Sequence, residues 1–114
     1  MKDETLFEKI ISREIPADIV YEDSDFIAFH DINPQAPFHV LVCPKKPIKM
    51  LSMSQSEDVH LIGRLMRLGA IVAAEAGYQN QFRAVINNGS EVGQTVFHLH
   101  LHILAGRSFS WPPG

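Results

Sequence analysis

The pattern of apolar and polar positions predicts two helices. Near the start of the chain, Thr5 and Glu8 have the spacing of a capping box, and apolar residues follow at helical intervals. This short helix is expected to end before Pro16, because the residue before a proline avoids helical backbone. Ser54 and Glu57 have the same capping-box spacing and are expected to start a second, longer helix.

The second helix is expected to be about 20 residues long, or roughly 30 Å, and to end at Gly77. Its apolar positions form a wide stripe, which predicts packing on a sheet. The core of this stripe is Leu61, Leu65, Leu68 and Val72. His60 is expected on the polar side of the helix and is assigned no role.

Runs rich in β-branched and aromatic residues predict the strands of an antiparallel sheet. Residues 19–22 and 26–30 are expected to form a hairpin. Further strands are expected at 38–43, 82–87 and 97–104. Strands and helices do not alternate as in a parallel sheet, so the order predicts an α+β fold. Both helices are expected to cover one face of the sheet.

The last predicted strand contains three histidines that alternate with apolar residues. A period of two places His98, His100 and His102 on one face, with the intervening apolar side chains on the other. Three interpretations are open for the imidazole face. The histidines are incidental on a solvated strand, they hold a catalytic zinc, or they act on a phosphate with one of them as nucleophile. No obvious cluster of further cysteine or carboxylate ligands accompanies them, so no metal is predicted.

The loop before the histidines favours the phosphate interpretation. Gly93, Gln94 and Thr95 offer backbone N–H groups and a hydroxyl, which together can form an anion-binding concavity. The same loop could also be a plain connection between two strands. Asn87 ends the preceding strand and can donate from its amide. If the two strands are neighbours, these groups converge near His100.

Composition and charge narrow the class of protein. The 114 residues suit a single domain, 1–114. A formal charge of −3 lacks the basic footprint of a nucleic-acid binder. No apolar run approaches the roughly 20 residues that span a bilayer, and the charged start, residues 1–4, has no signal-peptide core behind it. The lone Cys43 cannot form an internal disulfide. A cytoplasmic protein without nucleic-acid or membrane partners is therefore expected.

Several segments together resemble one family. Residues 98–104 match the His-φ-His-φ-His-φ-φ motif of the histidine-triad (HIT) superfamily, where φ is apolar. Residues 29–39 resemble the nucleoside-binding segment of its nucleotide-binding branch, the Hint proteins, and residues 93–98 resemble the phosphate loop of that branch. The ending, residues 111–114, is also similar. The likeness runs from about Thr5 to Gly114.

The resemblance implies a fold, a reaction and an assembly. The expected HIT-like fold is a homodimer whose two antiparallel sheets join into one. The expected reaction is hydrolysis of purine nucleoside 5′-phosphoramidates, such as AMP or GMP conjugates, through a nucleotidyl-histidine and without a cofactor. Two alternatives stay open. One is a dinucleoside polyphosphate hydrolase or nucleotidyl transferase of the same superfamily, and the other is a nucleotide-binding adaptor with incidental hydrolysis.

The resemblance also implies residue roles. His100 is the expected nucleophile, with His39, His98 and His102 completing the catalytic set and Asp31 holding the ribose hydroxyls. The expected base pocket consists of Phe7, Ile10, Phe29, His30 and Ile32. The expected phosphate site consists of Asn87, Gly93, Thr95 and His102. Gln94 and Val96 are also expected to bind the nucleotide. The branch usually shows Ser where Thr95 stands, and the hydroxyl is kept. Trp111 is expected to reach the partner subunit's active site and to shape leaving-group preference.

Overall fold

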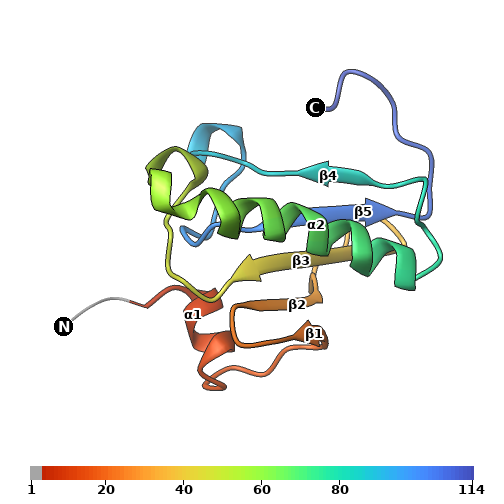
Figure 1. The fold of residues 1–114 in the computed structure, drawn as a ribbon. Coiled ribbons are helices and arrows are strands. Elements are labelled where there is room, and N and C mark those ends of the chain that lie inside the picture. The colour runs from red at the N-terminus through yellow and green to blue at the C-terminus, as the bar shows by residue number, and fades with distance from the viewer. Residues whose placement is uncertain (1–3) are drawn as a thin grey trace.

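The computed structural model describes residues 4–114 and shows a five-stranded antiparallel sheet with one long and one short helix (Figure 1). The order of the strands in the sheet is β1-β2-β3-β5-β4. In chain order the elements are α1 (Leu6–Ile11), β1 (Ile19–Glu22), β2 (Phe26–His30), β3 (Phe38–Pro44), η1 (Leu51–Met53), η2 (Ser56–Asp58), α2 (Val59–Glu75), β4 (Arg83–Val85), η3 (Ser90–Val92) and β5 (Leu101–Ala105), where η marks a 3-10 turn. The predicted α+β fold is confirmed. Residues 1–3 of the predicted charged start lie outside the described residues.

The capping box of α1 is present as predicted. The Glu8 backbone N–H donates to Thr5 Oγ1 at 3.1 Å, and the Thr5 N–H donates to Glu8 Oε1 at 3.1 Å. The helix ends at Ile11, before Pro16, so its predicted extent is confirmed.

The predicted capping box at Ser54 and Glu57 is wrong. The backbone N–H that is capped belongs to Gln55, and it donates to Asp58 Oδ2 at 2.8 Å. Asp58 is the better partner because its carboxylate also pairs with Lys46 Nζ at 2.5 Å, which holds it in place beneath the helix start. Consequently α2 begins at Val59 and has 17 residues. Its predicted stop is confirmed, since Gly77 has a φ of +92°.

The two helices lie on opposite faces of the sheet, so the prediction that both cover one face is wrong. Side chains alternate along β2, β3 and β5, and α2 packs on one set, which includes Val40, Val42 and Leu101. The other set packs against the buried residues of α1, Phe7 and Ile10. The connection between α1 and β1 has no regular spacing of apolar residues, so the sequence did not indicate on which face of the sheet α1 would pack.

The close approach of α2 to the sheet depends on Gly69. A Cβ atom at this position would lie 2.7 Å from Leu101 Cδ2 and 2.9 Å from Ile103 Cδ1. Because nonbonded carbon atoms prefer separations of roughly 3.5–4.0 Å, only glycine fits without movement of the neighbours. The α2 face is thus closely packed and apolar.

The histidine segment is only partly a strand. β5 begins at Leu101, whereas residues 97–100 leave the sheet ladder, and the predicted strand from 97 is too long. The reason is a separate bond: the Leu99 N–H donates to Ile48 O at 2.6 Å, beyond the end of β3. The alternation nevertheless persists, because Leu99 packs with Leu101 in the α2-side core. β4 is likewise shorter than the predicted 82–87.

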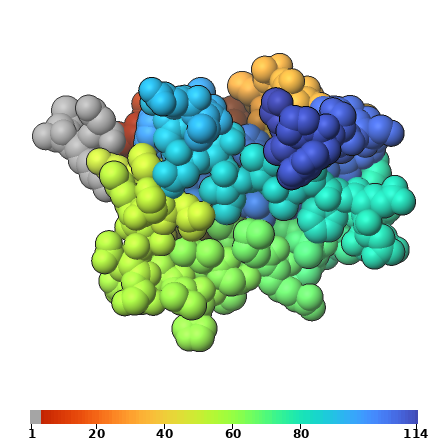
Figure 2. Space-filling model, turned by 90° about the horizontal axis from the view of Figure 1, so that it is seen from above, coloured from red at the N-terminus to blue at the C-terminus, as the bar shows by residue number. Residues whose placement is uncertain are grey.

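The C-terminal tail leaves β5 at the end of the sheet and lies beside the loop of residues 31–37. In the space-filling view the dark blue tail and the orange loop lie next to each other on the upper side (Figure 2). Within residues 4–114, no helix is both long and apolar enough to cross a membrane.

Candidate active site

A cavity of about 290 Å³ lies on the α1 side of the sheet. Apolar side chains of α1 and β2 form one part of its wall, and imidazoles near β5 form another. The predicted site residues in this wall are Phe7, Ile10, Phe29, His30, Asp31, Ile32, Gly93, Thr95, Val96, His100 and His102. The structure therefore brings together residues that are up to 95 positions apart in the sequence, from Phe7 to His102.

Five further residues line the cavity without having been predicted. They are Leu6, Ile15, Pro16, Ala17 and Leu41. Leu41 could have been found from the strand period, because it lies two residues after His39. Leu6 is the first residue of α1 and could have been found from the helical spacing it shares with Ile10. Ile15, Pro16 and Ala17 follow α1, where no repeating pattern marks the direction of a side chain.

His100 has a defined protonation state. Its Nδ1 lies 2.7 Å from the backbone oxygen of His98, and a carbonyl oxygen can only accept, so Nδ1 carries the proton. Burial lowers the pKa of His100, although the bond to the His98 oxygen opposes this. The ring is therefore neutral at pH 7, with an unprotonated Nε2. Such a nitrogen is a nucleophile or a base.

The ring of His100 is also held sterically. The edge of the Phe7 ring meets it at a centroid distance of 4.9 Å and an interplanar angle of 87°. Phe7 in turn packs edge-to-face on Phe29 at 5.4 Å. Residues of the predicted base pocket thus also orient the predicted nucleophile.

His98, which was predicted to be catalytic, does not line the cavity. Its Nε2 lies 2.7 Å from Pro44 O and therefore donates to it, and its Nδ1 has no hydrogen-bond partner among the described residues. Burial lowers the pKa of His98. The side chain fastens residues 97–100 to the end of β3, and by this bond it places the carbonyl that fixes His100.

A second set of hydrogen bonds fixes His39 and His102. The Gln35 backbone N–H donates to His39 Nδ1 at 3.0 Å, so in the neutral ring the proton is on Nε2. His39 Nε2 lies 2.9 Å from His102 Nδ1 and donates to it. This leaves the proton of neutral His102 on Nε2, in a residue that lines the cavity.

Electrostatics keep both of these rings neutral. Burial lowers the pKa of His39, and the Asp31 carboxylate only partly offsets this. Burial, followed by the neighbouring His100 and His39, lowers the pKa of His102 to about 4. Because the pKa values of His39, His100 and His102 are all lowered from the usual 6.5, the three rings are neutral at pH 7, and their hydrogen bonds fix the tautomers.

Asp31 lies in the cavity wall at the end of β2. Its Oδ1 accepts the Asn33 N–H at 2.8 Å, and its Oδ2 lies 3.5 Å from His39 Nε2. Carboxylate oxygens have further lone pairs, so Asp31 can still accept hydrogen bonds from a ligand.

The donor atoms of Asp31, His39 and His102 lie within 4.8 Å of one another. Two imidazoles and a carboxylate are a common zinc-binding set. However, His39 could ligate through Nε2 only if its proton moved to Nδ1, and Nδ1 accepts the Gln35 N–H. The residues as oriented therefore do not fit a metal.

The predicted anion-binding loop is partly occupied by its own bonds. The Gly93 N–H donates to Ser90 O at 3.2 Å and the Gln94 N–H donates to Gly89 O at 3.1 Å, because η3 turns the chain here. Among residues 4–114, nothing is bonded to the Thr95 and Val96 N–H groups. The available donors in this loop are therefore these two N–H groups and the Thr95 hydroxyl, whereas the predicted N–H groups of Gly93 and Gln94 are already bonded within the loop.

Neither Gln94 nor Asn87 lines the cavity, and their predicted contact with a nucleotide stays a prediction. The Gln94 side chain is buried, accepts the Gly89 N–H at 2.8 Å and donates to Lys49 O at 2.9 Å and Val96 O at 3.1 Å. These three bonds of the Gln94 side chain stabilise the loop of residues 89–96. Asn87 lies next to Gly93, with its Nδ2 3.5 Å from the position that a Cβ would take there.

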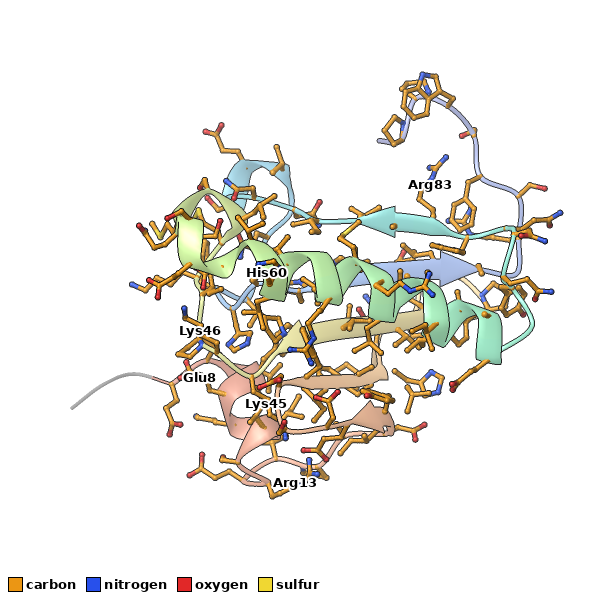
Figure 3. All side chains as sticks on the ribbon, in the orientation of Figure 1. Glu8, Arg13, Lys45, Lys46, His60 and Arg83 are labelled. Carbon is orange, nitrogen blue, oxygen red and sulfur yellow. The ribbon has the colours of Figure 1, made fainter. Side chains whose placement is uncertain are left out.

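Two other singled-out side chains point to solvent. His60 is exposed on α2, as expected (Figure 3). Trp111 is 82% exposed on the tail, which Arg83 holds through a bond from Nη2 to Ser110 O at 2.9 Å. Packing of Trp111 within its own subunit is therefore not observed.

Comparison with known proteins decides the family. The HIT domain family matches residues 12–109. The chain belongs to the HIT family. An uncharacterized HIT-like protein of Synechocystis is 63% identical over 114 residues, which is 100% of both chains. A maize protein described as a 14 kDa zinc-binding protein is 44% identical over 112 residues, covering 96% of this chain and 88% of that one.

Solved structures agree with the HIT assignment. A HIT family hydrolase from Legionella pneumophila superposes with a TM-score of 0.95 at 42% identity, covering 97% of this chain and 100% of that one. A HIT family hydrolase from Clostridium thermocellum gives 0.90 at 38% identity, covering 96% of each chain. The predicted superfamily and HIT fold are thus confirmed, and the structural relatives of this HIT protein include hydrolases.

Proposed function

We propose that this HIT protein hydrolyses purine nucleoside 5′-phosphoramidates, as the Hint branch does. The observation that carries the proposal is the tautomer of His100. Its Nδ1–H donates to the His98 carbonyl oxygen, with 2.7 Å between Nδ1 and that oxygen, and this leaves an unprotonated Nε2 in a residue that lines the cavity. A neutral imidazole held in this way is a nucleophile that needs no separate base to activate it.

The reaction has two displacements at phosphorus. In the first, His100 Nε2 attacks the α-phosphorus, a P–N bond to the ring forms, and the P–N bond to the amine breaks. In the second, water attacks the same phosphorus and gives up a proton to the solvent, and the bond to His100 breaks. The nucleoside monophosphate is released and His100 returns to its neutral form. Phosphoryl transfer depends mainly on positioning and charge stabilisation, and a site of amides and neutral imidazoles supplies both.

The tautomer of His102 supports a role as a hydrogen-bond donor. Its Nε2–H can donate to a phosphoryl oxygen, but a neutral ring cannot give that proton away without becoming an imidazolate. Its Nδ1 already accepts from His39, which itself accepts from a backbone amide. His102 is therefore a hydrogen-bond donor, and the amine leaves with the proton that its own nitrogen carries.

The rest of the cavity matches a purine nucleotide. Phe29, Ile32 and the α1 side chains provide flat apolar surface for a base, and Asp31 provides acceptors for the ribose hydroxyls. The Thr95 and Val96 N–H groups and the Thr95 hydroxyl are donors for phosphate oxygens.

We further propose a homodimer in the cytoplasm. β1 and β4 are the two edge strands of the sheet, and pairing one of them with its copy would continue the sheet across two subunits. An 82% exposed tryptophan on an anchored tail suits a contact with the partner's active site.

A substrate panel tests the proposal. Purified protein is offered adenosine 5′-phosphoramidate, a diadenosine polyphosphate and AMP, each at equal concentration. The proposal expects cleavage of the phosphoramidate at a kcat/KM far above that of the diadenosine compound. Preferential cleavage of the diadenosine compound would favour the polyphosphate hydrolase alternative, and AMP binding without turnover of either would favour an adaptor.

A further inference from the structure

The C-terminal tail makes an unusually close contact with the loop of residues 31–37. Gly106 has a φ of +96°, and a Cβ there would lie 2.9 Å from Pro37 Cβ and 3.2 Å from Tyr78 Oη. Any other residue would be strained and would push the tail away from the loop. The sequence thus places the next residue, Arg107, directly against the loop, where tail and loop lie side by side (Figure 2).

Arg107 is fixed on several sides. Its Nε–H donates to Gln35 O at 2.9 Å, and its Nη1 donates to Ser108 O at 2.9 Å. Its Cζ lies 4.0 Å from the centroid of the Phe109 ring, a cation–π contact. Within residues 4–114, no carboxylate pairs with it. The Arg107 guanidinium therefore binds the Gln35 backbone oxygen rather than a carboxylate.

The same peptide segment that Arg107 holds also orients His39. Gln35 accepts from Arg107 through its oxygen and donates through its N–H to His39 Nδ1 at 3.0 Å. The loop has prolines at 34 and 37 and no sheet ladder. Few other bonds hold Gln35: its side chain donates to Asn33 O at 3.0 Å, within the same loop.

We propose that Arg107 is a positioning residue which, by holding Gln35, selects the tautomer of His39 and through it the tautomer of His102. Without the Gln35 N–H, the proton of His39 can move to Nδ1. Nε2 of His39 would then accept from His102 Nδ1–H, and His102 Nε2 would face the cavity without a proton. The tautomer claim stands on the hydrogen bonds alone, and its effect on turnover rests on the proposed function.

Nitrogen-15 NMR of the histidine rings tests the tautomer claim directly. Wild type, Arg107→Gln, Arg107→Lys and Arg83→Gln are compared at a pH where the rings are neutral. Arg83 is the matched control, because it contacts the same Phe109 ring with its Cζ at 5.0 Å and bonds Ser110 O, yet it does not touch Gln35. Melting temperatures establish that each variant is folded.

Wild type and Arg83→Gln are expected to show His39 with an unprotonated Nδ1. Arg107→Gln is expected to shift His39 and His102 toward the opposite tautomers, and Arg107→Lys, which keeps a donor for Gln35 O, to restore the wild-type pattern at least in part. Unchanged ring shifts in folded Arg107→Gln, or an equal shift in Arg83→Gln, would overturn the inference.

Kinetics connect the tautomers to turnover. In Arg107→Gln, kcat for adenosine 5′-phosphoramidate is expected to fall about 10- to 100-fold, as for other losses of positioning. If wild type does not cleave this substrate but Arg107→Gln still shifts the tautomers, the proposed function fails and the positioning role of Arg107 stands.

Discussion

The two faces of the sheet are built from alternate residues of the same strands, and they are organised by different forces. On the α2 face, apolar side chains pack closely around Gly69, and shape alone accounts for the residues found there. On the α1 face, imidazoles stand beside a cavity. Backbone groups fix the tautomers of His39, His98 and His100, and the His39 ring in turn fixes that of His102. Successive side chains of one strand point to opposite faces, so the same strands contribute to the stabilising core on one face and to the candidate site on the other.

The largest effect is expected on the α1 face. His100→Asn removes the nucleophile but keeps a side chain of polar character, so turnover should fall by at least about 1,000-fold. The melting temperature and AMP binding should change little, because the core on the α2 side is untouched. Steady-state kinetics with calorimetry check this. Retention of more than about a tenth of wild-type turnover would remove His100 from the nucleophile's role.

The second effect separates ribose recognition from packing. Asp31→Ala should weaken AMP binding by about 1.5–3 kcal/mol, the usual range for hydrogen bonds to a charged group. It should weaken binding of the 2′,3′-dideoxy analogue less. Isothermal titration of both ligands measures the difference, and equal losses would mean that Asp31 acts only on the loop through Asn33.

The third prediction sharpens the contrast from the α2 side. Gly69→Ala places a Cβ 2.7 Å from Leu101 Cδ2. Overpacking of this kind should destabilise the fold by about 1–3 kcal/mol. The higher helix propensity of alanine offsets up to about 1 kcal/mol of this cost. Gly63→Ala is the matched control on the same helix, because nothing lies within 4 Å of its Cβ position. Denaturant unfolding should show Gly63→Ala to be neutral or stabilising. Equal effects of the two substitutions would refute the packing argument.

The fourth prediction concerns pH. The pKa values of His39, His98, His100 and His102 are all lowered by burial, that of His102 to about 4. An unfolded imidazole titrates near 6.5. Between these values the unfolded chain binds more protons than the folded chain, so stability falls as the pH falls from 6.5 toward 4.

Unfolding measured across that range tests this sign. His102→Gln should flatten the acid slope of the free energy of unfolding, whereas His60→Gln, at an exposed position, should leave it unchanged. An acid slope that is identical in both variants would show that His102 is not among the groups responsible.

Much of the difference between the two faces of the sheet could be predicted from the sequence, because it depends on the alternation of apolar and polar residues along a strand. The alternation from His98 to Ile103 correctly separated the imidazole side from the core, even where residues 97–100 leave the ladder. The position of α1 could not be predicted, since it depends on a loop without a pattern. The brace by Gln94 could not be predicted either, because one of its partners, Lys49, is 45 residues away.

The stereochemical outcome at phosphorus tests the central claim most directly. An adenosine 5′-phosphoramidate made chiral at the α-phosphorus with sulfur is hydrolysed in water enriched in heavy oxygen, and the configuration of the product is determined. Two in-line displacements, by His100 and then by water, predict net retention of configuration. Net inversion would mean that water attacks directly, and His100 would then be a base instead of a nucleophile.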